Sequence, residues 1–158
     1  MFEFGRAMTV TTMAGAALLT GGCATIAQRE SLTTKSNTQV VLAFEDTVFN
    51  RHQVQDGFNR YVGSSYTQHN PNVPDGPAAG AKLLTWLVTQ KFPQYHISVK
   101  RTLAQGDLVA VHLHAVPAPG ARGSAIVDIF RLSNGKIVEH WDVVEDVPEK
   151  SANDNTMF

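Results

Sequence analysis

The chain has only one cysteine, no cluster of basic residues and no group of histidines at metal-finger spacing. A single cysteine excludes an internal disulfide, so stability must come from a packed hydrophobic core. A net charge of -1 without a basic cluster argues against nucleic acid as the main partner. The length of 158 residues, with 43% hydrophobic and 17% charged residues, predicts one ordinary globular domain.

The N-terminal part differs in composition from the rest. Residues 7–19 are small, apolar and uncharged, but this run is shorter than the roughly 20 residues of a transmembrane helix. The sequence Leu-Thr-Gly-Gly-Cys-Ala (residues 19–24) resembles the end of a bacterial lipoprotein signal peptide. We therefore expect export, with the protein periplasmic or anchored to a membrane through lipidated Cys23. The alternative is a disordered extension of a cytoplasmic protein. The predicted boundaries are 1–35 for leader and spacer, 36–150 for the folded domain and 151–158 for a tail.

Hydrophobic periodicity divides the folded part into helices followed by strands. Apolar residues at helical spacing predict helices over residues 37–50, 54–61 and 78–92, with Asn37 as the cap of the first. Alternating apolar residues predict strands over residues 96–103, 108–116, 125–132 and 136–144. This order predicts an α+β domain in which three helices pack on a curved antiparallel sheet of about four strands.

The last two predicted strands flank an Asn-Gly pair, which is a strong hairpin signal. Strand alternation places Asp128 on a face with apolar neighbours, and His140 and Asp142 together on one face of the facing strand. A three-residue turn would set Asp128 opposite His140, whereas a two-residue turn would set it opposite Trp141. We favour the first register because it gathers the ionisable groups on one surface, although a bulge would alter it. Carboxylates and an imidazole among apolar residues indicate a pocket for proton chemistry.

Two segments of the chain resemble a known family. They are Tyr-Thr-Gln-His-Asn-Pro (residues 66–71) and Gly-Lys-Ile-Val-Glu-His-Trp-Asp (residues 135–142). Together with the order of elements, they make residues 37–147 similar to the SnoaL-like polyketide cyclase family. The resemblance implies the α+β cone shared with nuclear transport factor two and ketosteroid isomerase, in which a bent sheet and helices enclose an apolar pocket. Members most like this chain are described as aldol-condensation catalysts, and the resemblance implies acid/base chemistry without a cofactor.

The resemblance also implies roles for individual residues. Asp142 is the best match to the acid/base Asp of the family's cyclases, with His140 and His69 as nearby candidates. Asp128 lies in a strand that looks like the strand of ketosteroid isomerase whose protonated Asp donates a hydrogen bond to an oxyanion. Steroid isomerisation itself is not expected, because Phe44 and Asn70 stand where that enzyme has a tyrosine and its base.

We therefore expect an enzyme that removes a proton next to the carbonyl group of a small apolar substrate, for aldol-type cyclisation, isomerisation or dehydration. Asp142 with His140 would act as the base, and protonated Asp128 would stabilise the enolate oxygen together with His69 and Asn70. The other expected contacts with the substrate are Tyr66, His112, His114, Trp141 and Phe44.

Three alternatives remain open from the sequence. The same pocket would suit a non-catalytic module that binds an apolar ligand. His112 and His114 lie two apart on one predicted strand, and would suit a transition metal if Asp128 joined them. An outer sheet face with Ile137, Trp141 and Val143 would need covering, which predicts a homodimer.

Overall fold

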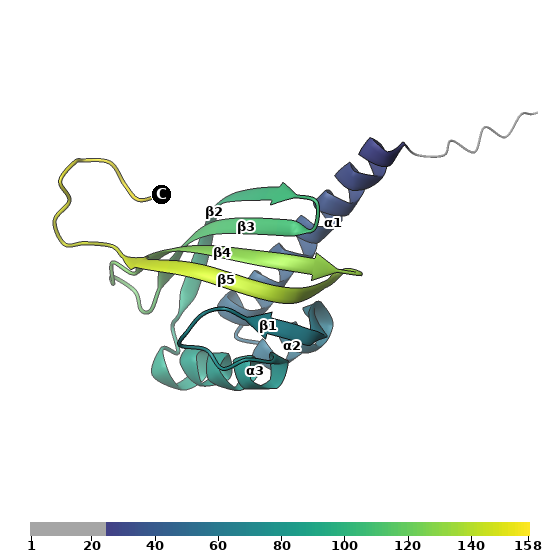
Figure 1. Cartoon of the computed structure of the whole chain (residues 1–158). Helices are drawn as coiled ribbons and strands as arrows, with labels where there is room; N and C mark the ends of the chain where they lie inside the picture. Colours follow the sequence, from purple (N-terminus) through teal and green to yellow (C-terminus); the bar gives the residue numbers. More distant parts are fainter. Residues whose placement is uncertain (1–24) are drawn as a thin grey trace, which may run out of the picture.

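The computed structural model describes residues 25–158 and places three helices against a five-stranded sheet (Figure 1). The predicted signal peptide and its lipidation site, Cys23, lie outside the described residues, so export and anchoring stay predictions. Within residues 25–158, no helix combines the length and the apolar character needed to cross a membrane.

The first helix begins earlier than its apolar pattern predicts. Helix α1 (Ile26–Glu45) starts after Thr25, whose hydroxyl oxygen accepts a hydrogen bond from the Gln28 N–H. The Gln28 side chain in turn accepts a hydrogen bond from the Thr25 N–H, which completes a capping box. The predicted cap, Asn37, is instead buried within the helix and donates a hydrogen bond to the Gly106 carbonyl oxygen at 3.3 Å.

The other helices follow their predicted positions closely. α1 continues into η1 (Asp46–Asn50), a stretch of wider π-type turn. α2 (Val54–Tyr61) has the predicted bounds, and α3 (Pro77–Trp86) continues into a second π-type stretch, η2 (Leu87–Lys91). The two π-type stretches together bring each helix to the end that its apolar pattern predicts, within about one residue.

The sheet contains one strand that the sequence pattern does not predict. Its order is β1-β5-β4-β3-β2, and β1 pairs with β5 in parallel, whereas the other neighbours are antiparallel. The expectation of about four antiparallel strands is therefore corrected to five strands in a mixed sheet. β1 has the polar sequence Val-Gly-Ser-Ser-Tyr-Thr-Gln, which lacks the alternation of apolar residues that predicts a strand. It also follows α2 without a turn signal. The strands are β1 (Val62–Gln68), β2 (His96–Gln105), β3 (Leu108–Val116), β4 (Ser124–Ser133) and β5 (Lys136–Asp146).

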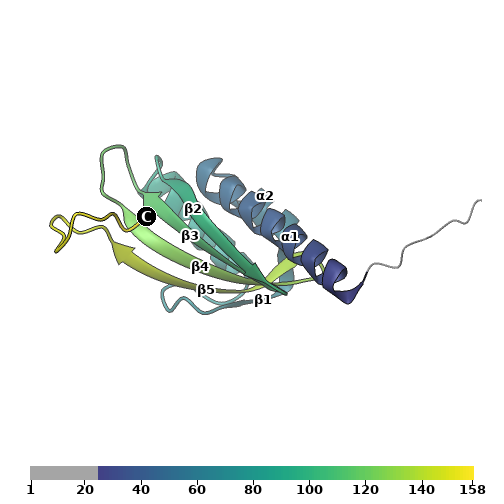
Figure 2. The same ribbon diagram turned by 90° about the horizontal axis from the view of Figure 1, so that it is seen from above.

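The helices lie on the inner side of a bent and twisted sheet, as Figures 1 and 2 show. Alternate residues of β3, namely Val109, Val111 and Leu113, are almost completely buried. They belong to the same hydrophobic cluster as Val41 and Phe44 of α1. The face of the sheet that carries these residues is therefore the one covered by the helices, and the side chains of β4 and β5 on this face point toward them.

The β4–β5 hairpin differs from both predicted registers. Asn134 and Gly135 have φ angles of 50° and 72°, as a two-residue hairpin turn requires. The pairing then shifts by one residue further along the hairpin, so Asp128 pairs with Asp142 and not with His140 or Trp141. The two carboxylates are therefore directly opposite each other.

A β-bulge at Val138 causes this shift. Leu132 pairs with Ile137, but Arg131 pairs with Glu139, which leaves Val138 as the extra residue. Ile137 consequently faces inward and is fully buried, so it does not belong to the outer face that the sequence suggested. The bulge shifts the alternation of the following residues by one position, and thereby keeps His140 and Asp142 on the inner face.

Gly123 lies where the loop before β4 approaches β3 most closely. Its φ is +71°, and a Cβ at this position would lie 2.0 Å from the Ala115 carbonyl oxygen. We expect Gly123→Ala to lower the free energy of unfolding by about 1–3 kcal/mol, because the backbone conformation and the contact both become strained. Urea unfolding measures the change. Gly120→Ala is the control, since Gly120 has a φ of +82° but its added Cβ would meet no atom within 4 Å. Equal losses in the two variants would contradict a special cost at Gly123.

Candidate active site

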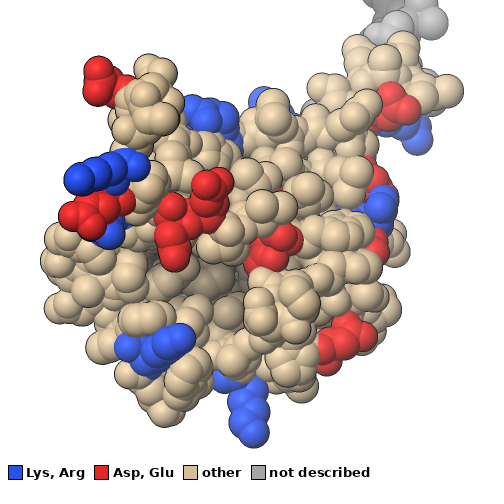
Figure 3. All heavy atoms as spheres, turned by 60° about the vertical axis from the view of Figure 1, so that its left-hand side comes forward, with Lys and Arg blue, Asp and Glu red and all other residues tan. Residues whose placement is uncertain are grey.

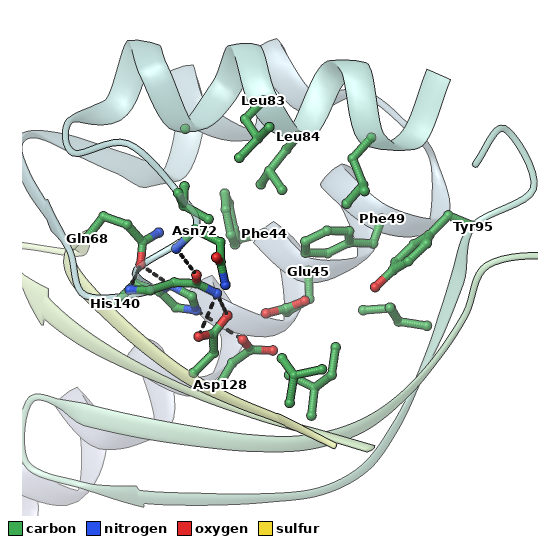
Figure 4. Close-up of a pocket in the computed structure, with 18 of the residues that line it drawn as sticks. Phe44, Glu45, Phe49, Gln68, Asn72, Leu83, Leu84, Tyr95, Asp128 and His140 are labelled. Carbon is green, nitrogen blue, oxygen red and sulfur yellow. Dashed lines mark hydrogen bonds and ion pairs between the residues drawn. The ribbon is translucent and has the colours of Figure 1, made fainter. Parts of the chain in front are cut away.

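A cavity of about 430 Å³ lies between the helices and the inner face of the sheet. Its wall is mostly apolar, with Asp128 and His140 on the side of the sheet and Glu45 entering from α1 (Figure 4). The space-filling view in Figure 3 shows a hollow in the surface with acidic side chains beside it, and on this face Lys and Arg side chains are scattered. The polar part of the lining includes Glu45, Tyr66, Gln68, Asn70, Asp128, His140 and Asp142.

Asp128 and His140 form a hydrogen-bonded pair at the floor of the cavity. His140 Nε2 lies 3.0 Å from Asp128 Oδ1, and both side chains are largely buried. On its other side, His140 Nδ1 lies 2.9 Å from Gln68 Oε1, which also accepts a hydrogen bond from the Asn70 backbone N–H. Because Gln68 Oε1 is an acceptor in both contacts, His140 Nδ1 must carry a proton. The proton between His140 Nε2 and Asp128 Oδ1 is then shared by the pair.

Asp142, next to the Asp128–His140 pair, is held by hydrogen bonds from Asn70. The Asn70 side-chain N–H₂ donates to both of its oxygens, with Nδ2 lying 2.8 Å from Oδ1 and 2.6 Å from Oδ2. The orientation of the Asn70 amide is set by its own Oδ1, which accepts a hydrogen bond from the Asn72 N–H at 2.8 Å. An ionised carboxylate, which accepts hydrogen bonds only, suits these contacts.

The carboxyl of Asp128 is perturbed by its surroundings. Burial raises its pKa, the hydrogen bond from His140 and the charge of that residue lower it in part, and Asp142 raises it again. Burial also raises the pKa of the Tyr66 hydroxyl, with a further contribution from Asp128. The cavity therefore favours the neutral form of groups that are acids in water.

Glu45, the last residue of α1, lies in the cavity wall and is only 1% exposed. Neither of its carboxyl oxygens has a hydrogen-bond partner among the described residues. Burial raises the pKa of Glu45 well above its ordinary value, and Asp128 raises it further. A third carboxyl group therefore lies in the cavity, in addition to the two that the sequence predicts.

His69 and Trp141 do not line the cavity, although the sequence suggested roles for both in the site. Each lies between two residues that point inward, so strand alternation turns it to the opposite face. There the two rings stack with their centroids 4.7 Å apart, and His69 Nε2 lies 2.8 Å from Glu139 Oε1. Arg131 pairs with the other oxygen of Glu139 at 2.8 Å and lowers the pKa of that carboxyl. His69 is thus corrected from a catalytic candidate to a surface residue beside the site.

His112 and His114 lie on the outer face of β3, while Asp128 faces the helices. His112 Nδ1 is 2.6 Å from Arg101 Nη1, and His114 Nε2 is 2.7 Å from the Arg122 carbonyl oxygen. The ring of Phe158, at the end of the predicted tail, packs against both imidazoles. Neither histidine therefore reaches the cavity, and the metal site predicted as an alternative from these two residues and Asp128 is wrong.

The residues that could bind a metal within the described part of the chain are instead Asp128, His140 and Asp142, which offer ligand atoms within 4.8 Å of one another. Their contacts in the structure do not favour this use. The Asp128 oxygen and the His140 nitrogen face each other across a hydrogen bond, and Asp142 is bound by the Asn70 amide. The group is arranged for holding and moving protons.

The sequence pattern did not reveal two residues of the cavity, Gln68 and Glu45. Gln68 orients His140, but it lies on the unpredicted strand β1. Glu45 had a detectable signal: it lies four residues after Val41 and three before Val48, both fully buried, so it is an acidic residue on the apolar face of a helix.

The fold places the chain in the class of α+β cones typified by nuclear transport factor two. A protein of unknown function with this fold from Mesorhizobium loti matches with a TM-score of 0.59 at 22% identity, over 71% of this chain and 93% of that one. A candidate polyketide cyclase from Acidithiobacillus ferrooxidans matches with a TM-score of 0.59 at 16% identity, over 70% and 88%. A candidate ketosteroid isomerase from Kribbella flavida matches with a TM-score of 0.60 at 17% identity, over 76% and 85%. At these identities the likeness establishes the fold.

The sequence itself gives the family. A model described as SnoaL-like polyketide cyclase matches residues 39–150, and the chain belongs to this family. No curated protein matches the chain. Family membership supports an enzyme that processes small molecules, and leaves the reaction and the substrate to be inferred from the site.

Proposed function

We propose that the protein abstracts a proton next to a carbonyl group of a small apolar molecule, without the help of a cofactor. The observation that carries this proposal is that Asp142 lies beside the Asp128–His140 pair in an apolar cavity. One oxygen or nitrogen atom from each of the three side chains lies within 4.8 Å of the other two. A base and a group that holds a proton are thereby available to one bound molecule. The volume of about 430 Å³ suits a small ligand.

The roles follow from the hydrogen bonds of each group. Asp142 is the base: it takes the proton as the C–H bond breaks, and the electron pair moves onto the carbonyl oxygen as an enolate. The Asp128–His140 pair shares one proton and stabilises the enolate by turning this proton toward its oxygen. Asn70 positions Asp142, and Gln68 positions His140, so Asn70 is not assigned the contact with the enolate that the sequence suggested.

The enolate can then attack a second carbonyl group, take back the proton at another carbon, or lose a leaving group. These outcomes correspond to aldol-type closure, isomerisation and dehydration. The rival function is a binding module that holds the same kind of molecule without reacting with it. The homodimer predicted from the sequence stays a prediction, now with Val143, which is 69% exposed, and Trp141 on the outer face.

Exchange of α-protons tests the proposed function directly. The full-length protein is incubated with small ketones and β-keto esters in deuterated buffer, and loss of the α-proton signal is followed by NMR. We expect exchange with at least one compound. His140→Ala should slow it roughly tenfold or more, because a proton-holding group of the site contributes at least that much.

His69→Ala is the matched control, since it removes the same side chain from the outer face and should leave exchange unchanged. An equal loss in both histidine variants would mean that the Asp128–His140 pair has no special role. Binding without exchange for every compound would favour the binding module.

A further inference from the structure

Glu45 is a buried acid that no part of the proposed reaction uses. It points into the cavity from the end of α1, between Phe44 and the side of the cavity that holds Asp128 (Figure 4). Its side chain is 1% exposed, and both carboxyl oxygens are without a hydrogen-bond partner among residues 25–158. Buried polar groups in folded proteins nearly always have partners, so an unpartnered carboxyl that lines a cavity indicates that something else supplies one.

The charge state of Glu45 follows from its neighbours. A carboxylate would be desolvated here without a hydrogen bond from the described residues in return, and it would be repelled by Asp128. Burial and Asp128 indeed raise its pKa well above the ordinary value. Burial, the missing hydrogen bonds and the neighbouring carboxyl all favour the carboxylic acid, which has an O–H donor as well as an acceptor oxygen.

The other two carboxyls of the cavity already have protein partners before a ligand binds. Asp128 shares its proton with His140, and Asp142 accepts two hydrogen bonds from Asn70. Glu45 is thus the acid of this group whose donor is free for a bound molecule. Tyr95, which Figure 4 shows on the same side of the cavity as Glu45, adds a phenol whose pKa is raised by burial and by Asp128.

We propose that Glu45 is a specificity-determining residue that donates a hydrogen bond to an uncharged oxygen of the ligand. The cavity would then select neutral molecules that carry a carbonyl, ether or hydroxyl oxygen within an apolar frame. Hydrocarbons of the same shape would leave the acid unpartnered, and carboxylate ligands would be repelled by Asp142, which accepts hydrogen bonds as a carboxylate. The inference concerns recognition, and it holds whether or not the bound molecule reacts.

Three probes of nearly the same shape separate these effects: acetonaphthone, a neutral ketone; isopropylnaphthalene, in which a methyl group replaces the oxygen; and naphthoate, the anion. Dissociation constants are measured by NMR titration of the full-length protein. We expect acetonaphthone to bind on the order of tenfold more tightly than isopropylnaphthalene, and naphthoate to bind most weakly.

Two substitutions then locate the donor. Glu45→Leu should abolish the preference for the ketone, whereas Glu45→Gln should keep most of it, because the amide N–H also donates a hydrogen bond. Glu30→Leu, a matched change at an exposed position of the same helix, should alter nothing. Unchanged or tighter binding of isopropylnaphthalene by Glu45→Leu shows that the cavity has remained intact.

The infrared carbonyl stretch of bound acetonaphthone gives a readout that a merely structural role would not move. It should rise to higher frequency in Glu45→Leu, because a hydrogen bond is lost, and stay low in Glu45→Gln. The proposal would be overturned if the ketone preference and the low stretching frequency both survived in Glu45→Leu. A water molecule or another side chain would then donate the hydrogen bond to the ligand in place of Glu45. Absence of any ketone preference in the unaltered protein would overturn it equally.

Discussion

Asp142→Asn should lower the rate of α-proton exchange at least about a hundredfold, which is the usual loss when a general base is removed. An amide has nearly the shape of the carboxylate but cannot take a proton from carbon. The change also keeps a side-chain oxygen to accept a hydrogen bond from Asn70, which now lies 2.6–2.8 Å from both carboxylate oxygens. The loss should therefore appear in turnover, with a smaller effect on the affinity for the substrate.

Glu145→Gln is the matched control for this substitution. It makes the same chemical change on the same strand, three residues further along, at an exposed position that does not line the cavity. Its exchange rate should equal that of the unaltered protein. Full activity of Asp142→Asn would show that Asp142 is not the base, and would transfer this role to Asp128.

Phe130→Ala should lower the free energy of unfolding by about 3–5 kcal/mol, the range for deleting a fully buried aromatic side chain. Phe130 is 2% exposed and makes edge-on contact with Phe44, at a ring-centroid distance of 6.0 Å. Its ring also lies 4.9 Å from that of His140, so the truncation removes part of the packing around the Asp128–His140 pair. Because folded domains commonly have only about 5–15 kcal/mol of stability, this single change should remove a large part of the total.

Denaturant titration followed by circular dichroism measures this loss, and Val127→Ala is its control. Val127 lies on the same strand but faces outward and is 38% exposed, so its truncation should cost less than about 1 kcal/mol. Similar losses for Phe130→Ala and Val127→Ala would contradict the assignment of the inner face of β4 to the core.

The sequence predicts the types of most elements because their side chains repeat with a clear period. The apolar spacing of α2 gives its exact bounds, and the alternation of β3 gives a strand that is buried on one face. The same alternation places His140 and Asp142 together on one face of their strand, which could be predicted without the structure. Their meeting with Asp128 was predicted from a three-residue turn, whereas the structure achieves it with a two-residue turn and a bulge.

The parts that could not be predicted depend on contacts between distant segments. β1 has no periodic pattern, and it becomes a strand because β5 offers its edge, with Gln68 paired to His140. The same pairing turns His69 outward, so the orientation of His69 could not be predicted while β1 itself was not. The role of Glu45 is a similar case: its position on the helix could be read from the sequence, but only the folded cavity shows that its carboxyl has no hydrogen-bond partner among residues 25–158.

The bulge at Val138 links the length of the hairpin to the chemistry of the cavity. If the same sequence paired without the bulge, the inward positions of β5 would pass to Glu139 and Trp141, and Asp142 would turn toward solvent. A relative that loses both the bulge and its extra residue would keep the histidine and the aspartate inward, whereas a relative that loses only one of the two would turn them outward. A mismatch between the length of this hairpin and its bulge, more than a difference in composition, should therefore mark the relatives in which this arrangement of groups is lost.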